Sequence, residues 1–287
     1  MKRTNFDVII IGGSYAGSAA ALALGRAMRR VMVLDNNDPC NRNTPHSHNF
    51  LTHDGRAPSE ITSAGLEDIL KYPTIQLNKQ QVVNVTKNKM GFEVITEDGT
   101  SYSCKKLLLA SGIRDIHPSI EGFSDCWGIS VIHCPYCHGY EVRGEKTAIL
   151  ANSVAAVHMA SLIAHWTSEL IILTNGKPEF DISDISNENN AAISIIEKRV
   201  VKIEHTNGYL NKVFFEDSSH LGISTMYAKL SFEQKTPFAA LLGCTINEMG
   251  YVEVDDFKRT SVKDLYAAGD NSNMARSVAA AVAAGTM

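Results

Sequence analysis

The chain has 287 residues, of which 44% are hydrophobic and 20% are charged, and its formal net charge is −4. These values are typical of a soluble globular protein of one or two domains that is large enough to bury a core without disulfide or metal cross-links. The basic residues are scattered and no apolar segment reaches the ~20 residues of a membrane helix, so we expect neither a nucleic-acid partner nor a membrane partner.

The N-terminal segment, MKRTNFDVIIIGGSYAGSAAALALG, allows two interpretations. Basic residues, an apolar run and small residues follow one another, which is the outline of a secretory signal. The alternative is a buried strand at 6–11, a glycine turn, a helix at 15–28 and a second strand at 31–34. Asp7 interrupts the apolar run and FDVIII is rich in β-branched residues. We therefore favour the βαβ unit and expect a cytoplasmic protein with reduced cysteines.

The pattern then repeats once. A long polar loop at 36–57 and a helix at 58–70 lead into a β-meander with a hairpin turn at Glu97–Gly99. The second copy comprises a strand, a helix, a strand and a meander, at 147–150, 154–166, 170–174 and 191–217. The last segment, 246–287, has no βαβ unit of its own and must complete the first copy.

This duplication predicts an α/β fold of two Rossmann-like, three-layer domains with β-meanders. The first domain is expected to be discontinuous, comprising 1–114 and 246–287. The second domain, 115–245, is inserted into it and carries the Cys-x-x-Cys motif. The polar, turn-rich segment 177–190 is expected to be a surface loop.

The first glycine turn, GGSYAG, is similar to a dinucleotide-binding fingerprint, in which glycines occupy positions one, three and six. Here those positions hold Gly12, Ser14 and Gly17, and the small serine still leaves room for a pyrophosphate at the helix N-terminus. Asp35 ends the second strand, where a carboxylate can accept a hydrogen bond from a ribose hydroxyl. Asp270, in LYAAGD, is placed to hold a sugar-chain hydroxyl, although such an Asp is more often a helix N-cap.

The stretch HCPYCHGYE holds two of the six cysteines, Cys134 and Cys137. Zinc needs about four ligands, but there is no second Cys-x-x-Cys, and His133 and His138 adjoin the cysteines too closely to close a tetrahedron. Cys-x-x-Cys-His also matches a haem attachment site, which would need export and an axial ligand. The third interpretation is a redox-active dithiol, in which Pro135 stiffens the turn and a helix N-terminus favours thiolate.

Four segments in this order, DVIIIGGSYAG, LLLASG, CPYCHG and TSVKDLYAAGD, resemble the low-molecular-weight thioredoxin reductase family of FAD-dependent pyridine nucleotide-disulfide oxidoreductases. CPYCHGYE and RNTPHSHNFLTHDG are most similar to the thioredoxin-reductase-like branch that includes the dithiol oxidases of disulfide natural products. The resemblance covers nearly the whole chain and implies FAD, a second domain of the NADPH-binding type and a homodimer. It implies that the residues around the flavin are Gly12, Ser14, Gly17, Asp35, Arg42, Asn49, Val83, Ala110, Gly112, Gly269 and Asp270.

The resemblance also implies catalytic roles and favours the redox pair over zinc or haem. By analogy, Cys137 contacts the flavin and Cys134 attacks the substrate disulfide. His138 takes the place where thioredoxin reductases usually carry an aspartate, and an imidazole there is suited to proton exchange near neutral pH. The alternative for His138 is a packing or surface histidine. The other cysteines are expected to be buried small hydrophobes, namely Cys40, Cys104, Cys126 and Cys244.

The sequence departs from the family pattern in two places. In TAILANSVAAVHMA, the three glycine positions of the second domain hold Ala151, Asn152 and Ser153, whose side chains obstruct a pyrophosphate. The following LTNGKPEF has Lys177 as its only cation where the family carries arginines for a 2′-phosphate, so we expect NADPH to bind weakly or not at all. RSVAAAVAAGTM stops where the family's last helix usually continues. We therefore expect the flavin-side helix, and part of the dimer contact, to differ from those of the family.

The sequence therefore predicts an FAD-dependent thiol–disulfide oxidoreductase. Two electrons would pass between FAD, the Cys134–Cys137 pair and an external dithiol or disulfide, which is either a thioredoxin-like protein or a small molecule. The sequence leaves the direction of electron flow open: the protein is either an NADPH-dependent reductase or an oxygen-linked dithiol oxidase. The alternative of another class is a flavin-bound scaffold that binds a partner without turnover.

Overall fold

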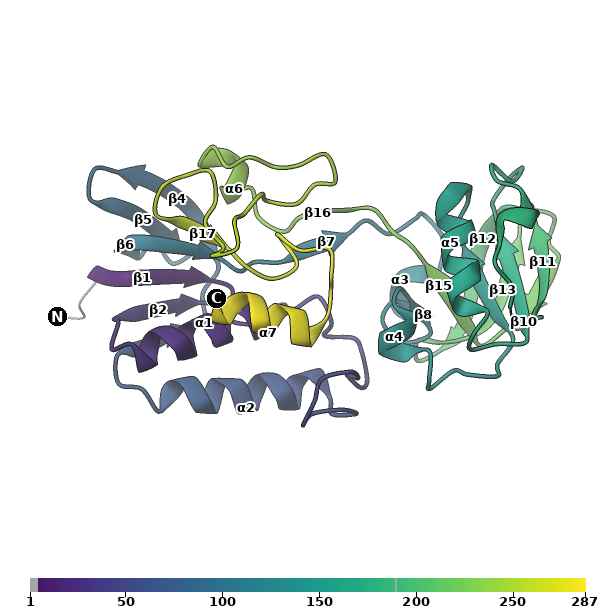
Figure 1. Cartoon of the computed structure of the whole chain (residues 1–287), viewed down its shortest axis with the longest axis horizontal. Coiled ribbons are helices and arrows are strands. Elements are labelled where there is room, and N and C mark those ends of the chain that lie inside the picture. Colours follow the sequence, from purple (N-terminus) through teal and green to yellow (C-terminus); the bar gives the residue numbers. More distant parts are fainter. Residues whose placement is uncertain (1–4, 189) are drawn as a thin grey trace. The chain divides into compact units, whose positions relative to one another are not determined.

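The computed structural model describes residues 5–188 and 190–287. Residues 1–4, the start of the segment considered as a secretory signal, and Asn189 of the predicted surface loop lie outside the described residues. The chain divides into two compact units, which are described separately (Figure 1). Unit 1 comprises the chain up to Arg42, Asn49–Arg114 and Phe232–Met287, and unit 2 comprises Asn43–His48 and Asp115–Ser231.

The chain re-enters unit 1 at Phe232, earlier than the residue 246 expected from the sequence. The reason is that β16 (Phe232–Gln234) pairs with β7 (Ile113–Asp115). Four residues further on, Phe238 is 3% exposed and packs in the same core as Phe6. The segment before residue 246 is therefore part of the first core.

Unit 1 is built on a seven-stranded sheet in the order β3-β2-β1-β6-β5-β4, with β17 paired to β6. Its strands are β1 (Asn5–Ile11), β2 (Val31–Leu34), β3 (Ile75–Asn78), β4 (Val82–Asn88), β5 (Gly91–Thr96), β6 (Ser101–Leu109) and β17 (Leu265–Ala267). β1, β2, β3, β6 and β17 pair in parallel, while β4, β5 and β6 form the predicted antiparallel meander. The apolar runs of β1 and β2 are buried because both faces of the sheet are covered.

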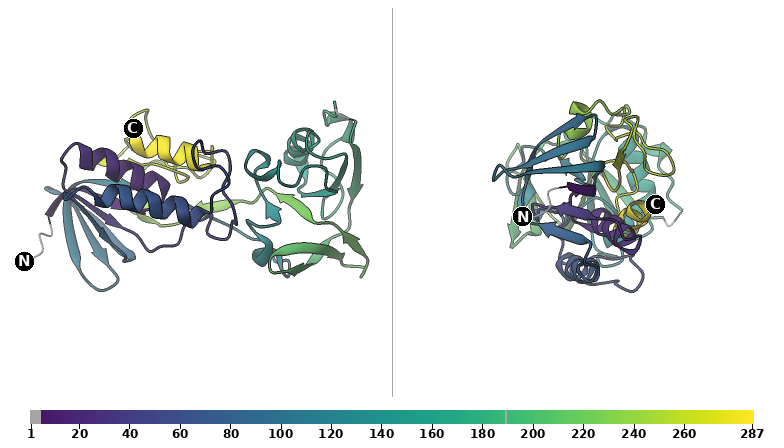
Figure 2. Two further views of the ribbon diagram at one scale, coloured as in Figure 1. Left: turned by 90° about the horizontal axis from the view of Figure 1, so that it is seen from below. Right: turned by 90° about the vertical axis from the view of Figure 1, so that its left-hand side faces the viewer.

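Three helices lie on one face of this sheet, α1 (Tyr15–Arg26), α2 (Pro58–Leu70) and α7 (Val278–Thr286) (Figures 1 and 2). Small side chains such as Ala20 let α1 pack close to the strands, in the same buried cluster as Ile10. The neighbouring Ile9 faces the other way, because side chains alternate along a strand. It packs with the meander and with Phe238 of the short helix α6 (Phe238–Leu241).

Unit 2 has a five-stranded sheet in the order β11-β10-β9-β15-β8 and a three-stranded meander, β12-β13-β14. The strands are β8 (Val131–Ile132), β9 (Thr147–Leu150), β10 (Glu169–Leu173), β11 (Ala192–Ile196), β12 (Val200–Thr206), β13 (Tyr209–Phe215), β14 (His220–Gly222) and β15 (Thr225–Ala228). The helices are α3 (Phe123–Cys126), α4 (Pro135–His138), α5 (Ser153–Ile163) and the 3₁₀ turn η1 (Ile182–Asp184). Helix α5 packs on one face of the larger sheet and the meander on the other, so the unit has three layers.

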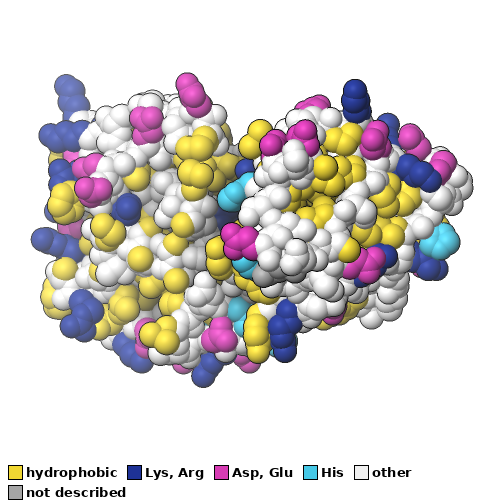
Figure 3. Space-filling view, turned by 45° about the vertical axis from the view of Figure 1, so that its right-hand side comes forward, with side chains coloured by type: hydrophobic (Ala, Val, Ile, Leu, Met, Phe, Trp, Pro, Cys, Tyr) yellow, Lys and Arg dark blue, Asp and Glu magenta, His cyan; other side chains and the backbone are white. Residues whose placement is uncertain are grey.

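A membrane-spanning helix, a metal-binding cluster or a surface with charges of one sign would each indicate another class of protein. No helix within residues 5–188 and 190–287 is long and apolar enough to cross a membrane. Over the same ranges, no group of three or more His, Cys, Asp or Glu side chains is arranged to hold a metal ion. On the face drawn in Figure 3, acidic and basic side chains are interspersed. The features that bear on chemistry are therefore the cavities and the cysteine motif.

Candidate functional site

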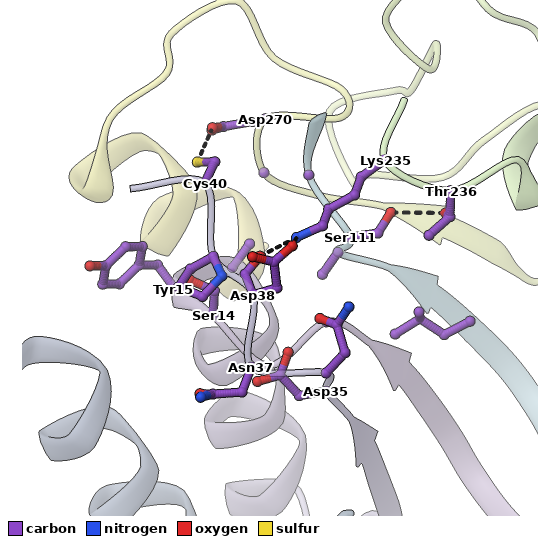
Figure 4. Close-up of a pocket in the computed structure, with 18 of the residues that line it drawn as sticks. Ser14, Tyr15, Asp35, Asn37, Asp38, Cys40, Ser111, Lys235, Thr236 and Asp270 are labelled. Carbon is purple, nitrogen blue, oxygen red and sulfur yellow. Dashed lines mark hydrogen bonds and ion pairs between the residues drawn. The ribbon is translucent and has the colours of Figure 1, made fainter. Parts of the chain in front are cut away.

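A cavity of about 330 Å³ lies in unit 1 at the carboxyl ends of β1, β2 and β6 (Figure 4). Ligands of open α/β sheets bind at this edge, beside the turn that leads into the first helix. Seven of the residues predicted to surround a flavin line the cavity: Gly12, Ser14, Asp35, Ala110, Gly112, Gly269 and Asp270. The fold thus brings together residues from both ends of the chain.

The glycine turn of this cavity has no room for side chains. Gly12 has a φ of 102°, and a Cβ added to it would lie 2.3 Å from the carbonyl oxygen of Ala110. A Cβ on Gly17 would lie 1.8 Å from the carbonyl oxygen of Gly12. Ser14 caps α1 without a side-chain hydrogen bond to the first turn of the helix. The bare turn and the helix N-terminus fit a pyrophosphate.

Four predicted flavin residues lie outside the cavity lining. Gly17 packs behind the glycine turn, and Val83 is 53% exposed while its neighbour Val82 lines the cavity. Arg42 lies 2.9 Å from the carboxylate of Asp38. Asn49 adopts a φ of 61°, and its N–H donates to Asp54 over 2.8 Å. The roles of these four toward a flavin stay predictions.

Sequence reasoning missed an ion pair in this cavity. Lys235 Nζ lies 2.8 Å from Oδ2 of Asp38 and also donates to the Asp38 carbonyl oxygen. The hydrogen bond from Lys235, together with the charges of Lys235 and Arg42, lowers the pKa of Asp38. The two residues are far apart in the sequence, so no local pattern could have revealed the pair.

One of the four remaining cysteines was predicted wrongly. Cys104, Cys126 and Cys244 are buried, as expected of small hydrophobic residues. Cys40 is exposed, lines the cavity and lies 3.7 Å from the Asp270 carboxylate. It belongs to the polar loop after β2, which passes over the end of the sheet rather than through the core.

The Cys-x-x-Cys motif forms one turn of helix in unit 2. Cys134 is the N-cap of α4, and Pro135 occupies the first helical position, where its missing N–H is not needed. The backbone N–H groups of Cys137 and His138 donate to the Cys134 carbonyl over 3.2 Å. This turn holds the two sulfur atoms 2.7 Å apart. Little movement of either residue is needed to convert the dithiol into a disulfide.

The surroundings of the motif shift the pKa values of Cys137 and His138 in opposite directions. The hydrogen bond to Cys134 raises the pKa of Cys137 strongly, and burial and the charge of Cys134 act in the same direction. Burial lowers the pKa of His138, the charge of His48 lowers it further, and Glu141 opposes both. Cys137 therefore retains its proton when Cys134 ionises, and His138 is neutral and able to accept a proton at neutral pH.

The glycine-free turn of unit 2 is closed by the side chain of Asn152. Its Oδ1 accepts from the N–H groups of Ser153 and Glu179, over 2.9 and 2.8 Å. Its Nδ2 donates to the carbonyl oxygens of Thr174 and Lys177, over 3.3 and 3.1 Å. Asn152 thus ties the turn before α5 to the loop after β10. In this type of fold the first segment holds the pyrophosphate of a dinucleotide, and the second holds its ribose or 2′-phosphate.

Two Rossmann-type units, with a dinucleotide-type cavity in one and a Cys-x-x-Cys turn in the other, define a dinucleotide-dependent oxidoreductase. The family model "Pyridine nucleotide-disulphide oxidoreductase" matches residues 6–285, and the chain belongs to this family. The chain is 30% identical to thioredoxin reductase tcpT of Claviceps purpurea, over 97% of this chain and 90% of that protein. It is also 30% identical to thioredoxin reductase sirT of Leptosphaeria maculans, over 98% of this chain and 91% of that protein.

A solved structure gives the same result. The putative thioredoxin reductase TrxB from Bacillus anthracis superposes with a TM-score of 0.91 at 33% identity, covering 98% of this chain and 95% of that one. The predicted resemblance and the predicted fold of two Rossmann-type domains are therefore confirmed. The protein is an oxidoreductase, and its family implies FAD binding and typically NADPH.

Proposed function

We propose that this chain is an FAD-dependent thiol–disulfide oxidoreductase. Two electrons pass between FAD in unit 1, the Cys134–Cys137 pair and an external dithiol or disulfide. The observation that carries the proposal is the 2.7 Å separation of the two sulfur atoms in a helix turn whose neighbour, His138, is held neutral. Membership of the family supports FAD as the cofactor and disulfide oxidoreduction as the reaction class.

The residues of the unit 1 cavity fit FAD. Gly12 and the N-terminus of α1 form a cradle for the pyrophosphate, and Asp35 and Asp270 offer acceptors for sugar and sugar-chain hydroxyls. When bound, FAD accepts or supplies the electron pair. Lys235 and Asp38 lie in the same cavity and would have to accommodate the cofactor.

The chain's own residues perform thiol–disulfide exchange in two steps. In the reducing direction, Cys134 gives its proton to His138, its thiolate attacks one sulfur of the substrate disulfide, and the leaving sulfur takes the proton from His138. Cys137 then gives its proton to His138 and attacks Cys134, which breaks the mixed disulfide, and the second substrate sulfur leaves with that proton. Two thiols are released and a Cys134–Cys137 disulfide remains. Oxidation of a substrate dithiol is the reverse sequence.

Two other functions fit these observations less well. The names of the relatives favour an NADPH-dependent reductase of thioredoxin or a small disulfide, but the Asn152 side chain in the second turn opposes it. Without that donor, the dithiol-oxidising direction with oxygen as final acceptor is the natural one. A non-catalytic scaffold is opposed by the closely paired thiols. The resemblance supports a homodimer, and a cytoplasmic location stays a prediction.

Anaerobic titration of the FAD-loaded protein with dithiothreitol tests the proposal. We expect the oxidised-flavin absorbance to fall, and thiol trapping to show that Cys134 and Cys137 cycle between dithiol and disulfide. If the protein takes up no FAD, the assignment of FAD as its cofactor is wrong. If the flavin of Cys134→Ser protein is reduced as fast as that of the wild type, the cysteine pair does not carry the electrons.

The carboxylate of Asp35 provides a test of the cavity. Asp35→Ala should weaken FAD binding about 10- to 100-fold, because losing a hydrogen bond to a charged acceptor costs about 1.5–3 kcal/mol. Fluorescence titration of apoprotein with FAD measures the effect. Glu67→Ala, which removes an exposed carboxylate from α2, is the matched control. Equal FAD affinities for both variants would exclude a role for Asp35.

A further inference from the structure

The charged side chains that line the cavity of unit 1 are mostly acidic. Among the described residues of its lining, the carboxylates are those of Asp35, Asp38 and Asp270, and the cations are Arg114 and Lys235. A pyrophosphate adds further negative charge to the same space. The N-terminus of α1 supplies only about half a positive charge. A cation beside the pyrophosphate would therefore offset the repulsion that the carboxylates exert on it.

Of these two cations, Lys235 is the one that reaches into the cavity. Its side chain is 20% exposed, whereas that of Arg114 is 70% exposed and pairs with Glu233 on β16. Lys235 follows β16 directly, and its backbone N–H donates to the Gly112 carbonyl oxygen over 3.3 Å. Figure 4 shows its side chain extending from there to Asp38. The backbone beside β16 thus anchors the base of a side chain whose amino group lies inside the cavity.

Asp38 holds this amino group through two contacts, which is fewer than a lysine can make. A lysine ammonium has three N–H donors. Lys235 Nζ lies 2.8 Å from Oδ2 of Asp38 and donates to the Asp38 carbonyl oxygen, so these two contacts leave a third donor. The other carboxylate oxygen of Asp38 lies 2.9 Å from the Arg42 guanidinium. Asp38 therefore keeps a cationic partner when Lys235 turns toward another anion.

We propose that Lys235 is a ligand of the FAD pyrophosphate. Its ammonium balances the charge of Asp38 and donates to a phosphate oxygen of the bound cofactor, while Arg42 keeps Asp38 paired. The inference rests on the proposed function, which places FAD in this cavity. Because the contact is made to the phosphates, Lys235 favours a cofactor that carries a diphosphate over one that lacks it.

The alternative role for Lys235 is structural. In that role the Lys235–Asp38 pair only ties β16 to the loop after β2. The two roles predict opposite effects of Asp38→Asn on FAD binding. If Lys235 is a phosphate ligand, Asp38→Asn tightens binding, because it removes a carboxylate from the cavity and leaves Lys235 to the cofactor. If the pair is only a tie, Asp38→Asn weakens binding as much as the loss of Lys235 does, because either substitution breaks the tie.

Calorimetric titration of the full-length apoprotein with three probes makes the test. The probes are FAD, ADP, which carries the diphosphate without the flavin, and adenosine, which carries neither. The variants are Lys235→Met, Lys235→Arg and Asp38→Asn, and the control is Lys106→Met. Lys106 also belongs to unit 1 and forms an ion pair of 2.7 Å with Asp264, but it does not line the cavity. Circular dichroism verifies that each variant is folded.

We expect Lys235→Met to weaken the binding of FAD and ADP about 10- to 100-fold and to leave adenosine binding unchanged, because one charge-assisted hydrogen bond to a phosphate is lost. Lys235→Arg should restore most of both affinities, since arginine also binds phosphate. Asp38→Asn should tighten FAD and ADP, and Lys106→Met should change none of the three affinities. Equal weakening by Lys235→Met and Asp38→Asn, or an equal loss for adenosine, would overturn the proposal. If Lys235→Met does not fold, Lys235→Gln carries the same comparison.

The wild-type protein distinguishes the two levels of failure. If wild-type apoprotein binds neither FAD nor ADP, the proposed function loses its cofactor and the role of Lys235 fails with it. If wild-type protein binds both while Lys235→Met binds them with the wild-type affinities, only the role of Lys235 is wrong.

Discussion

Cys134→Ser protein should lose turnover by about three orders of magnitude and should gain a long-wavelength charge-transfer band on its oxidised flavin. The resemblance assigns the flavin contact to Cys137, and a thiolate beside an oxidised flavin gives such a band. In the wild type, the hydrogen bond to Cys134, burial and the charge of Cys134 raise the pKa of Cys137. Serine carries no charge at this position, so the pKa of Cys137 should fall and its thiolate should become populated as the pH rises.

Cys137→Ser provides the contrast. It should lose turnover to the same degree but show no charge-transfer band, because the remaining sulfur is the one that faces the substrate. Absorbance spectra of both variants across a pH series make the comparison. Cys244→Ala is the control, since burial raises the pKa of that thiol and leaves it unreactive. A band that appears in Cys137→Ser instead would reverse the two roles, and full turnover in both variants would exclude the pair.

The regular elements of the fold could be predicted closely from the sequence. The helix at Pro58–Leu70 and the strand at Val31–Leu34 begin and end at the predicted residues, because apolar periodicity and flanking turn residues mark both ends. The return of the chain to unit 1 was placed too late. It occurs through β7 and β16, which have three residues each and are too short to carry a periodic pattern.

The candidate site could be predicted only where a local motif encodes it. Gly12 and the cysteine pair could be named as candidates because their spacing is typical of turns that only certain residues can adopt. The Lys235–Asp38 pair was missed because it forms between segments that meet only in the folded unit. Such ionisable residues follow no characteristic spacing, so in the sequence they cannot be told apart from ordinary surface residues.

NADPH should reduce the flavin of this protein at least about 100-fold more slowly than dithiothreitol does. Asn152 fills the turn that a pyrophosphate would approach and makes four hydrogen bonds there. Lys177 is the one cation in LTNGKPEF, where a 2′-phosphate would need a forked arginine partner. The absence of one charge-assisted hydrogen bond costs about 1.5–3 kcal/mol, so the absence of two weakens nucleotide binding roughly 100-fold or more. Anaerobic stopped-flow mixing with each reductant measures both rates.

Two asparagine variants show whether the turn itself is the obstacle. Asn152→Gly should speed reduction by NADPH, because it clears the space before the N-terminus of α5. Asn187→Gly should not, although Asn187 also bridges a loop of unit 2, through hydrogen bonds of 2.8 Å to both backbone groups of Ala191. This control shows how far the loss of a loop-bridging asparagine in unit 2 changes the rate by itself, when the turn before α5 is left intact. Rapid, saturable reduction of wild-type flavin at micromolar NADPH would contradict the prediction, because the Asn152 turn would then admit the nucleotide and the protein would be an NADPH-dependent reductase.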